Sequence, residues 1–272
     1  MMSKSMVSIV LPTYNRAHIL EMAIESVLCQ TYPYFELIIV DDGSTDNTES
    51  VVLNYQDSRI RYYKLKENGG QAAARNFGIE HASYDYIAFE DSDDIWHEDK
   101  LAIQMECLIN AAPEVGFVYH KIRYDMGNQR VAILPSEEIA NEKKSGNIYS
   151  QLLWDNLVDC PSILAKKECV MQIEGFDSEM TALEDYDFAL KMAKTYHALF
   201  IDKVLLESTY STSGVSGNAV NYLMASCYLL QKYKEDYLRT NTLNHRIEII
   251  LRDAERIGMK EQFVKLLELR LR

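Results

Sequence analysis

Carboxylates crowd the end of an apolar stretch in the segment YIAFEDSDDIW, residues 86–96. The four acids are Glu90, Asp91, Asp93 and Asp94. Side chains two residues apart on an extended strand lie on one face, so Asp91 and Asp93 can reach the same ligand. Hard oxygen ligands of this kind suit Mg²⁺ or Mn²⁺, which proteins bind together with substrate phosphates. The alternative interpretation is a solvated acidic turn in which Asp94 caps the following helix.

A second acidic motif, VDDGSTDNT (residues 40–48), also follows an apolar strand pattern. Asp41 ends the predicted strand, and Asp42 begins a tight turn through Gly43. A carboxylate at such a strand end can accept a hydrogen bond from a ribose hydroxyl or a base N–H. The same residues also fit a turn and a helix cap without any ligand.

Two further segments carry groups suited to a nucleotide. In LPTYNR (residues 11–16), Pro12 is expected to end the first strand, and Tyr14 offers a flat face to a base. In NGGQAAARNFG (residues 68–78), the glycines let backbone approach a ligand, and Arg75 lies one turn into a helix. The chain contains neither G-x-G-x-x-G nor G-x-x-x-x-G-K, so it has no dinucleotide fingerprint and no P-loop.

The elements that must position these segments alternate between strand and helix. Strand patterns lie at 6–11, 35–41, 59–65, 85–90 and 115–120, with helical patterns between them. This alternation predicts an α/β fold with a mostly parallel, Rossmann-like sheet flanked by helices on both faces. Ligands of such sheets bind outside the carboxyl ends of the strands, which is where the four segments meet.

The second half of the chain has a different pattern. After residue 121 we expect a hairpin, followed by helices near 148–157 and 184–195. The stretch STYSTSGVSGN (208–218) is typical of a mobile loop. Beyond it, residues 219–272 are continuously helical in pattern and rich in basic side chains.

Composition and charge exclude several classes of protein. The net charge of −13 argues against a nucleic-acid binder, because phosphate neutralisation requires a basic surface. Five scattered cysteines without a C-x-x-C pair argue against a zinc site or a disulfide framework. No stretch approaches the roughly 20 apolar residues that span a bilayer, and the first residues lack the apolar core of a signal peptide. A cytoplasmic location is therefore expected.

In this order and spacing, the four segments resemble the nucleotide-sugar-binding half of family 2 glycosyltransferases of the GT-A fold. Residues 161–194, in which GFD is followed by ED, look like the acceptor-side segment of that family. The resemblance covers about residues 6–210. It implies a GT-A type domain at 1–218, with a nucleotide-binding half at about 6–120 and an acceptor-side half at about 121–218, and a helical extension at 219–272.

The resemblance assigns roles in donor binding to particular residues. It implies that Asp41 contacts the uracil, that Thr13 helps to hold the base, and that Arg75 lies near the nucleotide. The first acid of the Asp-x-Asp pair, Asp91, approaches the ribose. The predicted nucleotide site as a whole consists of Pro12, Thr13, Tyr14, Asp41, Gly70, Arg75, Asp91 and Ser92.

The resemblance also assigns the metal ligand and the base. It implies that Asp93 holds Mn²⁺ or Mg²⁺ on the diphosphate, and that Asp185, with Glu184 beside it, is the general base. The charges of Glu184 and Asp187, together with burial, are expected to raise the pKa of Asp185. An alternative interpretation is that these acids only face the dipole at a helix N-terminus.

The implied reaction is the metal-dependent transfer of a hexose or N-acetylhexosamine from a UDP-sugar to a hydroxyl of a saccharide acceptor, with inversion. The leaving diphosphate develops charge that a metal stabilises, and the attacking hydroxyl loses its proton to a carboxylate on the opposite side. Two other functions stay open. A sugar nucleotidyltransferase shares the layout but has a basic Gly-rich loop, which PTYNRAH lacks. A catalytically silent binding or scaffold subunit is disfavoured by the retained acids.

The expected partners are a UDP-sugar and a saccharide acceptor, and not a nucleic acid. The helical extension is expected to pack on the catalytic domain or on a second copy in a homodimer. In an alternative interpretation, its basic side chains hold it peripherally on an anionic membrane surface at the inner face. The loop at 208–218 lacks the Arg or His that closes on the diphosphate in many relatives, so no third metal ligand is assigned.

Overall fold

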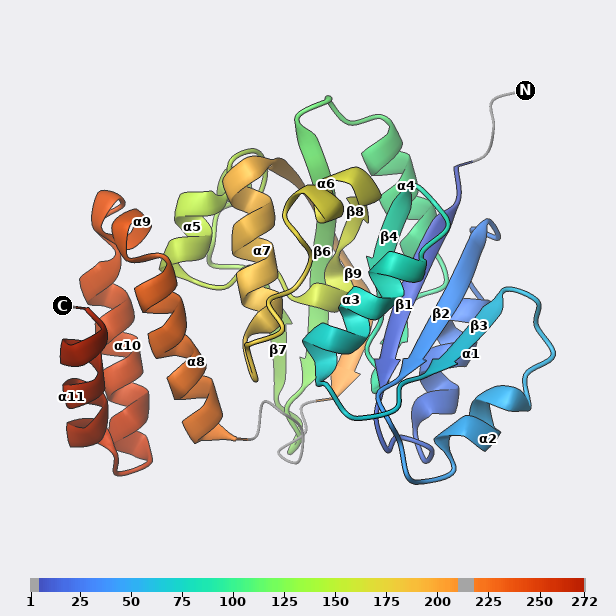
Figure 1. Ribbon diagram of the computed structural model, residues 1–272. Helices are drawn as coiled ribbons and strands as arrows, with labels where there is room; N and C mark the ends of the chain where they lie inside the picture. Colours follow the sequence, from blue (N-terminus) through green and yellow to red (C-terminus); the bar gives the residue numbers. More distant parts are fainter. Residues whose placement is uncertain (1–4, 210–217, 272) are drawn as a thin grey trace.

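A nine-stranded sheet organises the computed structural model, which describes residues 5–209 and 218–271 (Figure 1). Its strands are β1 (Val7–Thr13), β2 (Phe35–Asp41), β3 (Ile60–Lys64), β4 (Tyr86–Phe89), β5 (Asp94–Trp96), β6 (Val115–Asp125), β7 (Val131–Leu134), β8 (Leu164–Lys166) and β9 (His197–Thr209). They lie in the order β3-β2-β1-β4-β8-β6-β9-β5, with β7 paired to β6. The predicted α/β class with a helical C-terminal region is confirmed.

Helices cover this sheet and extend beyond one side of it. They are α1 (Leu20–Leu28), α2 (Thr48–Leu53), α3 (Gln71–His81), α4 (Lys100–Ile109), α5 (Tyr149–Trp154), α6 (Lys167–Gln172), α7 (Glu184–Thr195), α8 (Ala219–Lys232), α9 (Lys234–Arg239), α10 (Leu243–Arg256) and α11 (Lys260–Arg270). Two 3₁₀ turns, η1 (Asn141–Lys143) and η2 (Cys160–Ser162), complete the set. No helix in the described ranges is both long enough and apolar enough to cross a membrane.

The parallel part of the sheet is its N-terminal half. β1 pairs in parallel with β2 and β4, and β2 with β3, as strand–helix alternation requires. β8 then runs antiparallel between β4 and β6, and β6 pairs in parallel with β9. The predicted strand at 115–120 is therefore present as β6, but a strand from later in the chain separates it from β4.

Three strands, β5, β8 and β9, are not predictable from alternation. β5 and β8 each have three residues, too few to establish a period. β9 is long, but its pairing with β6 shifts register between Ile201 and Val204, so Asp202 and Lys203 interrupt the pattern. Part of the predicted loop at 208–218, residues 210–217, lies outside the described residues.

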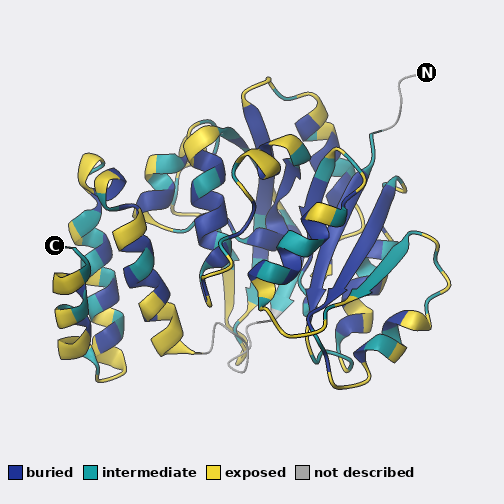
Figure 2. Ribbon diagram, in the orientation of Figure 1, coloured by how far each residue is buried: buried dark blue, intermediate teal, exposed yellow. Residues whose placement is uncertain are grey.

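Alternate residues of the central strands pack on the two faces of the sheet. Ile9 and Leu11 of β1 belong to a hydrophobic cluster with α1 and α4. Val10 belongs to the opposite cluster, which includes residues of α3, α5, α7 and α8. β1, β2 and β4 are consequently buried on both faces, and exposed residues gather on the outer helices and loops (Figure 2).

β1 also continues further than its proline suggests. The strand runs through Pro12 to Thr13, so the expectation that Pro12 ends it is wrong. Beyond Val10, opposite the last residue of β4, the remaining residues of β1 pair only with β2. Proline is tolerated at such an edge because one side of the strand needs no backbone donor.

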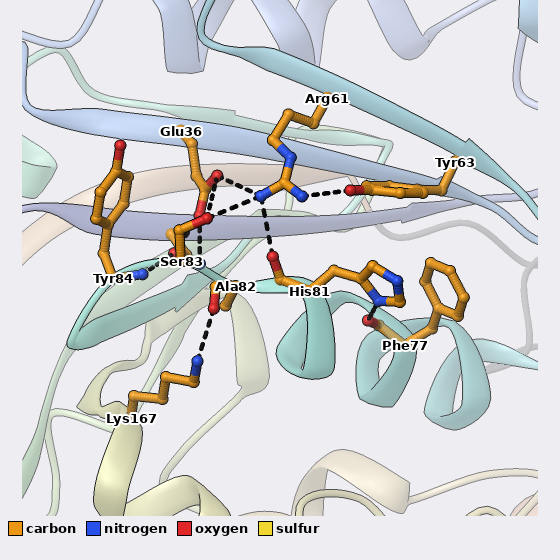
Figure 3. Close-up of polar contacts among 10 residues, drawn as sticks. Glu36, Arg61, Tyr63, Phe77, His81, Ala82, Ser83, Tyr84 and Lys167 are labelled. Carbon is orange, nitrogen blue, oxygen red and sulfur yellow. Dashed lines mark hydrogen bonds and ion pairs between the residues drawn. The ribbon is translucent and has the colours of Figure 1, made fainter.

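A polar cluster ties the strands together at the amino ends of the parallel strands (Figure 3). Glu36 of β2 accepts hydrogen bonds from the Ser8 hydroxyl, the Ser83 backbone N–H and Arg61 at 2.7, 2.6 and 2.7 Å. Arg61 also donates to the carbonyl oxygen of His81 at the end of α3. The cluster therefore fixes the C-terminus of α3 against β1, β2 and β3.

The helical extension packs on the rest of the chain, as expected. Asp187 of α7 accepts from Lys232 at 2.9 Å and from the Tyr233 hydroxyl at 2.8 Å, so this acid anchors α8. Residues as late as Phe263 and Leu267 belong to the same hydrophobic cluster as the face of β1 that carries Val10. The domain boundary at 218, a homodimer and a membrane contact stay predictions.

Gly78 sets the distance between α3 and the sheet. A Cβ at this position would overlap the Cγ1 methyl of Val10. The glycine of the RNFG sequence thus has a packing reason, because it lets the helix that carries Arg75 lie close to β1. Without this approach the N-terminus of α3 would not reach the carboxyl end of the strand.

We expect Gly78→Ala to destabilise the protein by about 1–3 kcal/mol in urea unfolding, because overpacking outweighs the better helix propensity of alanine. Removing the methyl groups opposite makes room for the new Cβ. The same substitution in a Val10→Ala background is therefore expected to cost clearly less. Equal costs in the two backgrounds would contradict this account of the contact.

Candidate active site

A cavity of about 430 Å³ opens at the carboxyl ends of the parallel strands. Its volume lies in the range of small-molecule sites. It is lined by Pro12, Thr13, Tyr14, Arg16, Asp42, Asn68, Gly70, Gln71, Ala74, Arg75, Asp91, Ser92, Asp93, Asp94, Tyr124, Asp159, Pro161, Ala182, Leu183, Glu184, Asp185, Ser208 and Tyr222. Every residue of the predicted site except Asp41 is in this lining, so segments distant in sequence meet as expected.

The end of β1 supplies groups that are free to bind a ligand. The Thr13 hydroxyl is buried and has no hydrogen-bond partner among residues 5–209 and 218–271. A buried polar atom without a partner is unfavourable unless a ligand or water satisfies it. Tyr14 follows with 45% of its surface exposed, so its ring is accessible at the mouth of the cavity. Both observations agree with the predicted contacts to a base.

The prediction that Asp41 lines the crevice is wrong. Asp41 is fully buried, and its two oxygens accept from the Ser44 N–H at 2.7 Å and the Tyr62 hydroxyl at 2.6 Å. The neighbouring Asp42 faces the cavity instead and accepts from the N–H groups of Gly69 and Gly70, both at 2.8 Å. Strand alternation explains the exchange, because successive side chains point to opposite faces.

Gly70 holds the start of α3 at the cavity. Its φ of 85° lies in a region that residues with a side chain rarely adopt, and its N–H points to Asp42. The helix that begins at Gln71 brings Arg75 to the cavity one turn later. The predicted role of the glycine segment as a ligand-approaching backbone is consistent with this geometry.

Arg75 bridges the two halves of the site. Its guanidinium is 2% exposed and donates to Asp91 at 2.7 Å and to Glu184 at 2.8 Å. The same group lies over the ring of Phe176, 5.3 Å from its centroid. The neighbouring Asn76 exchanges two hydrogen bonds with the backbone of Phe176. α3 therefore fixes both the Asp-x-Asp strand end and the segment that leads into α7.

The acids after β4 occupy different environments. Asp93 lines the cavity and forms no salt bridge with a cation of the described residues. Burial and the charge of Asp91 raise its pKa. Asp94 begins β5 opposite Ser208, and burial followed by the charge of Asp91 raises its pKa strongly. α4 starts only at Lys100, with Asp99 before it, so the alternative in which Asp94 caps this helix is wrong.

Asp185 lies at the N-terminus of α7 and faces the cavity. The residue before this helix, Leu183, has a left-handed φ of 59°, a strained conformation typical of functional sites. Burial first, and then the carboxyl group of Asp159, raise the pKa of Asp185 well above its usual range. The expected contribution of Asp187 is not found, because that acid binds the extension.

Several lining residues were not assigned a role from the sequence, and four of them bear on the chemistry of the site. They are Arg16, Tyr124, Asp159 and the acid Asp42. Arg16 follows the PTYN sequence directly and its charge acts on Asp93, so the end of that motif was an available signal. Tyr124 and Asp159 lie on β6 and before η2, and carry no motif.

A divalent cation fits the charge of this cavity. The lining carries seven carboxyl groups, of Asp42, Asp91, Asp93, Asp94, Asp159, Glu184 and Asp185, against the two guanidinium groups of Arg16 and Arg75. Arg75 is already shared by the carboxylates of Asp91 and Glu184. Asp93 is a hard oxygen donor of the lining that Arg75 does not pair with, so it is available to an ion. No cluster of three potential ligands lies within the described ranges, so such an ion would need oxygens from a substrate.

Comparison with known proteins identifies relatives. The model of "Glycosyl transferase family 2" matches residues 8–162. An uncharacterized glycosyltransferase of Rickettsia felis is 38% identical over 73% of this chain, which spans 32% of that protein's length. The protein WfgD of Escherichia coli, named a UDP-Glc:alpha-D-GlcNAc-diphosphoundecaprenol beta-1,3-glucosyltransferase, is 31% identical over 87% of this chain and 90% of its own length.

Two solved structures share the fold. S. aureus TarS 1–349 in complex with UDP-GlcNAc superposes with a TM-score of 0.75 at 18% identity, over 98% of this chain and 79% of that one. Mannosyltransferase PcManGT from Pyrobaculum calidifontis, in complex with GDP-Man and Mn²⁺, gives 0.68 at 21% identity, over 99% and 74%. At these identities the likeness shows the GT-A fold alone.

We expect Arg75→Met to destabilise the protein by about 3–5 kcal/mol, because it leaves the buried carboxylate of Glu184 and the partly exposed carboxylate of Asp91 without a counter-charge. The matched control is Arg256→Met, which removes an arginine paired with Asp253 on an exposed helix surface. Its cost is expected to stay below about 1 kcal/mol in the same urea titration. Similar costs for the two variants would show that the bridge does not hold the site together.

Proposed function

The chain belongs to glycosyl transferase family 2, and on that premise we propose that it transfers a hexose or N-acetylhexosamine from a UDP-sugar to a saccharide hydroxyl with inversion. The observation that carries the proposal is the Arg75 bridge. It ties Asp91 of the donor side to Glu184, the residue next to Asp185, across one cavity. A displacement at a sugar carbon needs the donor-binding groups and the base within one cavity.

On the donor side, the uridine is proposed to lie against Thr13 and Tyr14. The unpartnered Thr13 hydroxyl offers a hydrogen bond to the base, and the Tyr14 ring offers a stacking face. Asp42, placed in the cavity by the Gly69 and Gly70 N–H groups, takes over the contact first assigned to Asp41. Asp91, fixed by Arg75, is proposed to accept from the ribose hydroxyls.

Asp93 and Arg16 are proposed to face the diphosphate. A cation held by Asp93 would supply Lewis-acid stabilisation for the charge that develops on the leaving group. Asp93 suits Mn²⁺ or Mg²⁺ because its carboxylate is a hard oxygen donor that lines the cavity. Arg16 lies close enough for its charge to act on Asp93, so it provides a fixed cation at the same end of the cavity.

On the acceptor side, Asp185 is proposed to take the proton of the attacking hydroxyl. The pKa of this carboxyl group is raised above that of an ordinary aspartate, so the group binds a proton more strongly. A general base is most effective when its pKa lies near the working pH. Glu184 is engaged by Arg75 and therefore serves to position the helix start rather than to accept protons. With Asp185 opposite the leaving group, a single displacement inverts C1.

The class of acceptor is proposed from the relatives. WfgD is named for a diphosphoundecaprenol-linked sugar, and the similar TuaG of Bacillus subtilis is named for teichuronic acid biosynthesis. We propose a lipid-linked or polymer-linked saccharide as the acceptor of this chain and, because a lipid-linked acceptor is held in a membrane, a peripheral location at the inner face.

The main alternative is a catalytically silent subunit that binds a nucleotide sugar. A sugar nucleotidyltransferase is not favoured, because the turn after β1 carries Thr13, Tyr14 and Asn15 in place of a basic glycine-rich loop. The two remaining candidates differ in turnover, so release of UDP separates them.

We expect the purified chain to release UDP from a UDP-hexose or UDP-N-acetylhexosamine in the presence of Mn²⁺ and a saccharide acceptor, and not in the presence of EDTA. Asp93→Asn is expected to lower this turnover by at least about 10²-fold, since even indirect metal partners are worth 10–100-fold. The control is Asp99→Asn, which changes an acid outside the cavity. Full activity of Asp93→Asn at saturating metal, or UDP binding without any release in the wild type, would contradict the proposal.

A further inference from the structure

A second carboxyl group lies against Asp185. Asp159, half-buried in the cavity wall before η2, is within hydrogen-bonding reach of the Asp185 side chain. Its position is fixed on both sides. One oxygen accepts from the Cys160 N–H at 3.0 Å, and the other accepts from the hydroxyl of Tyr124 on β6.

Two carboxylates cannot form a hydrogen bond unless one of them carries a proton. Both oxygens of Asp159 already accept a hydrogen bond, one from the Cys160 N–H and one from the Tyr124 hydroxyl, so Asp159 meets Asp185 as an acceptor. The proton between the two groups is therefore held mainly by Asp185. From the part of the chain that the structure describes, Asp185 itself accepts a local bond, from the Tyr186 N–H at 2.8 Å.

We propose that Asp159 is a positioning residue for the transfer step: its carboxyl group, fixed by Tyr124, hydrogen bonds to Asp185 and shares one proton with it. The inference rests on the proposed function, because it assumes that Asp185 is the base. It assigns a role to a residue that neither the sequence motifs nor the comparisons single out.

Other charged or titratable groups around Asp185 do not supply this interaction. Glu184 precedes it but is paired with Arg75 of α3, whose positive charge opposes the proton on Asp185. The Cys160 thiol and the Tyr222 hydroxyl of α8 also face the group and are kept neutral by burial. Asp155 is exposed and does not line the cavity.

The shared proton has a defined path in the reaction. Before a turnover the pair loses its proton to solvent, which leaves two adjacent carboxylates. As the acceptor oxygen bonds to the sugar carbon, the bond from that carbon to the diphosphate oxygen breaks and its electron pair leaves with UDP. The proton of the acceptor hydroxyl passes to Asp185, and the hydrogen bond to Asp159 forms again. Repulsion between the two carboxylates thus makes Asp185 a stronger base.

The test is the pH dependence of kcat/KM for the acceptor, measured by UDP release at saturating donor and Mn²⁺ between about pH 5 and pH 9. In Asp159→Asn, the acidic limb is expected to move to lower pH by about one unit or more, because Asp185 then ionises without a neighbouring charge. Asp155→Asn, in the same stretch of chain but outside the cavity, is expected to keep the wild-type limb. A loss of rate in Asp159→Asn with an unmoved limb overturns the inference.

A second readout does not depend on activity. A raised carboxyl pKa in the folded state means that stability falls as pH rises from about 4, the pKa of an unfolded aspartate, to the folded value. Asp159→Asn removes that loss, so its melting temperature relative to wild type is expected to increase between pH 5 and pH 8. A constant difference overturns the inference. Asp159→Ser, which keeps a helix-capping side chain, is expected to behave alike and serves if the asparagine variant does not fold.

Asp185→Asn distinguishes the two levels of the proposal. General-base assistance is worth about 10² to 10⁴-fold, so this variant is expected to lose that much turnover while it keeps UDP binding. Near wild-type turnover would contradict the base assignment in the proposed function. The melting measurement would then still decide whether Asp159 and Asp185 share a proton.

Discussion

One buried guanidinium holds the candidate site together. Arg75 donates to Asp91, which follows β4, and to Glu184 at the start of α7. The two acids are 93 positions apart in the sequence. A buried arginine is tolerated only when its charge is matched, and these carboxylates would repel one another without it. Gly78 and Asn76 serve the same arrangement, because one brings α3 against β1 and the other fixes the backbone around Phe176.

The excess of acids around this bridge explains what the cavity can accept. A diphosphate is repelled by seven carboxyl groups unless cations intervene, and the fixed cations of the lining are Arg16 and the already engaged Arg75. A divalent ion at Asp93 therefore couples donor binding to metal binding. Burial, and after it the charge of neighbouring carboxyl groups, raise the pKa of Asp185 and of Asp93. The acids of the cavity thus serve two steps of the proposed reaction, metal-assisted departure of the diphosphate and deprotonation of the acceptor hydroxyl.

Much of this arrangement was predictable from the sequence, because its motifs lie at the ends of strands with a clear period. β1, α3, β4 and α7 formed where expected, and these elements with the turn after β4 bring Thr13, Arg75, Asp93 and Asp185 into one cavity. The alternation pattern could not tell whether Asp41 or Asp42 faces the cavity, because a shift of one residue in the end of β2 exchanges their directions. Asp159 and Tyr124 were out of reach of the sequence, because antiparallel insertion of β8 and a bulged β9 bring them to Asp185.

The central claim is that a carboxylate at Asp185 stands opposite the leaving diphosphate, so that one displacement completes the reaction. The configuration of the product at the anomeric carbon tests this most directly. With an α-linked UDP-sugar as donor, proton NMR of the purified product is predicted to show the coupling of a β-linked sugar. A product that retains the α configuration would contradict the placement of the base, and with it the mechanism derived from the Arg75-centred site.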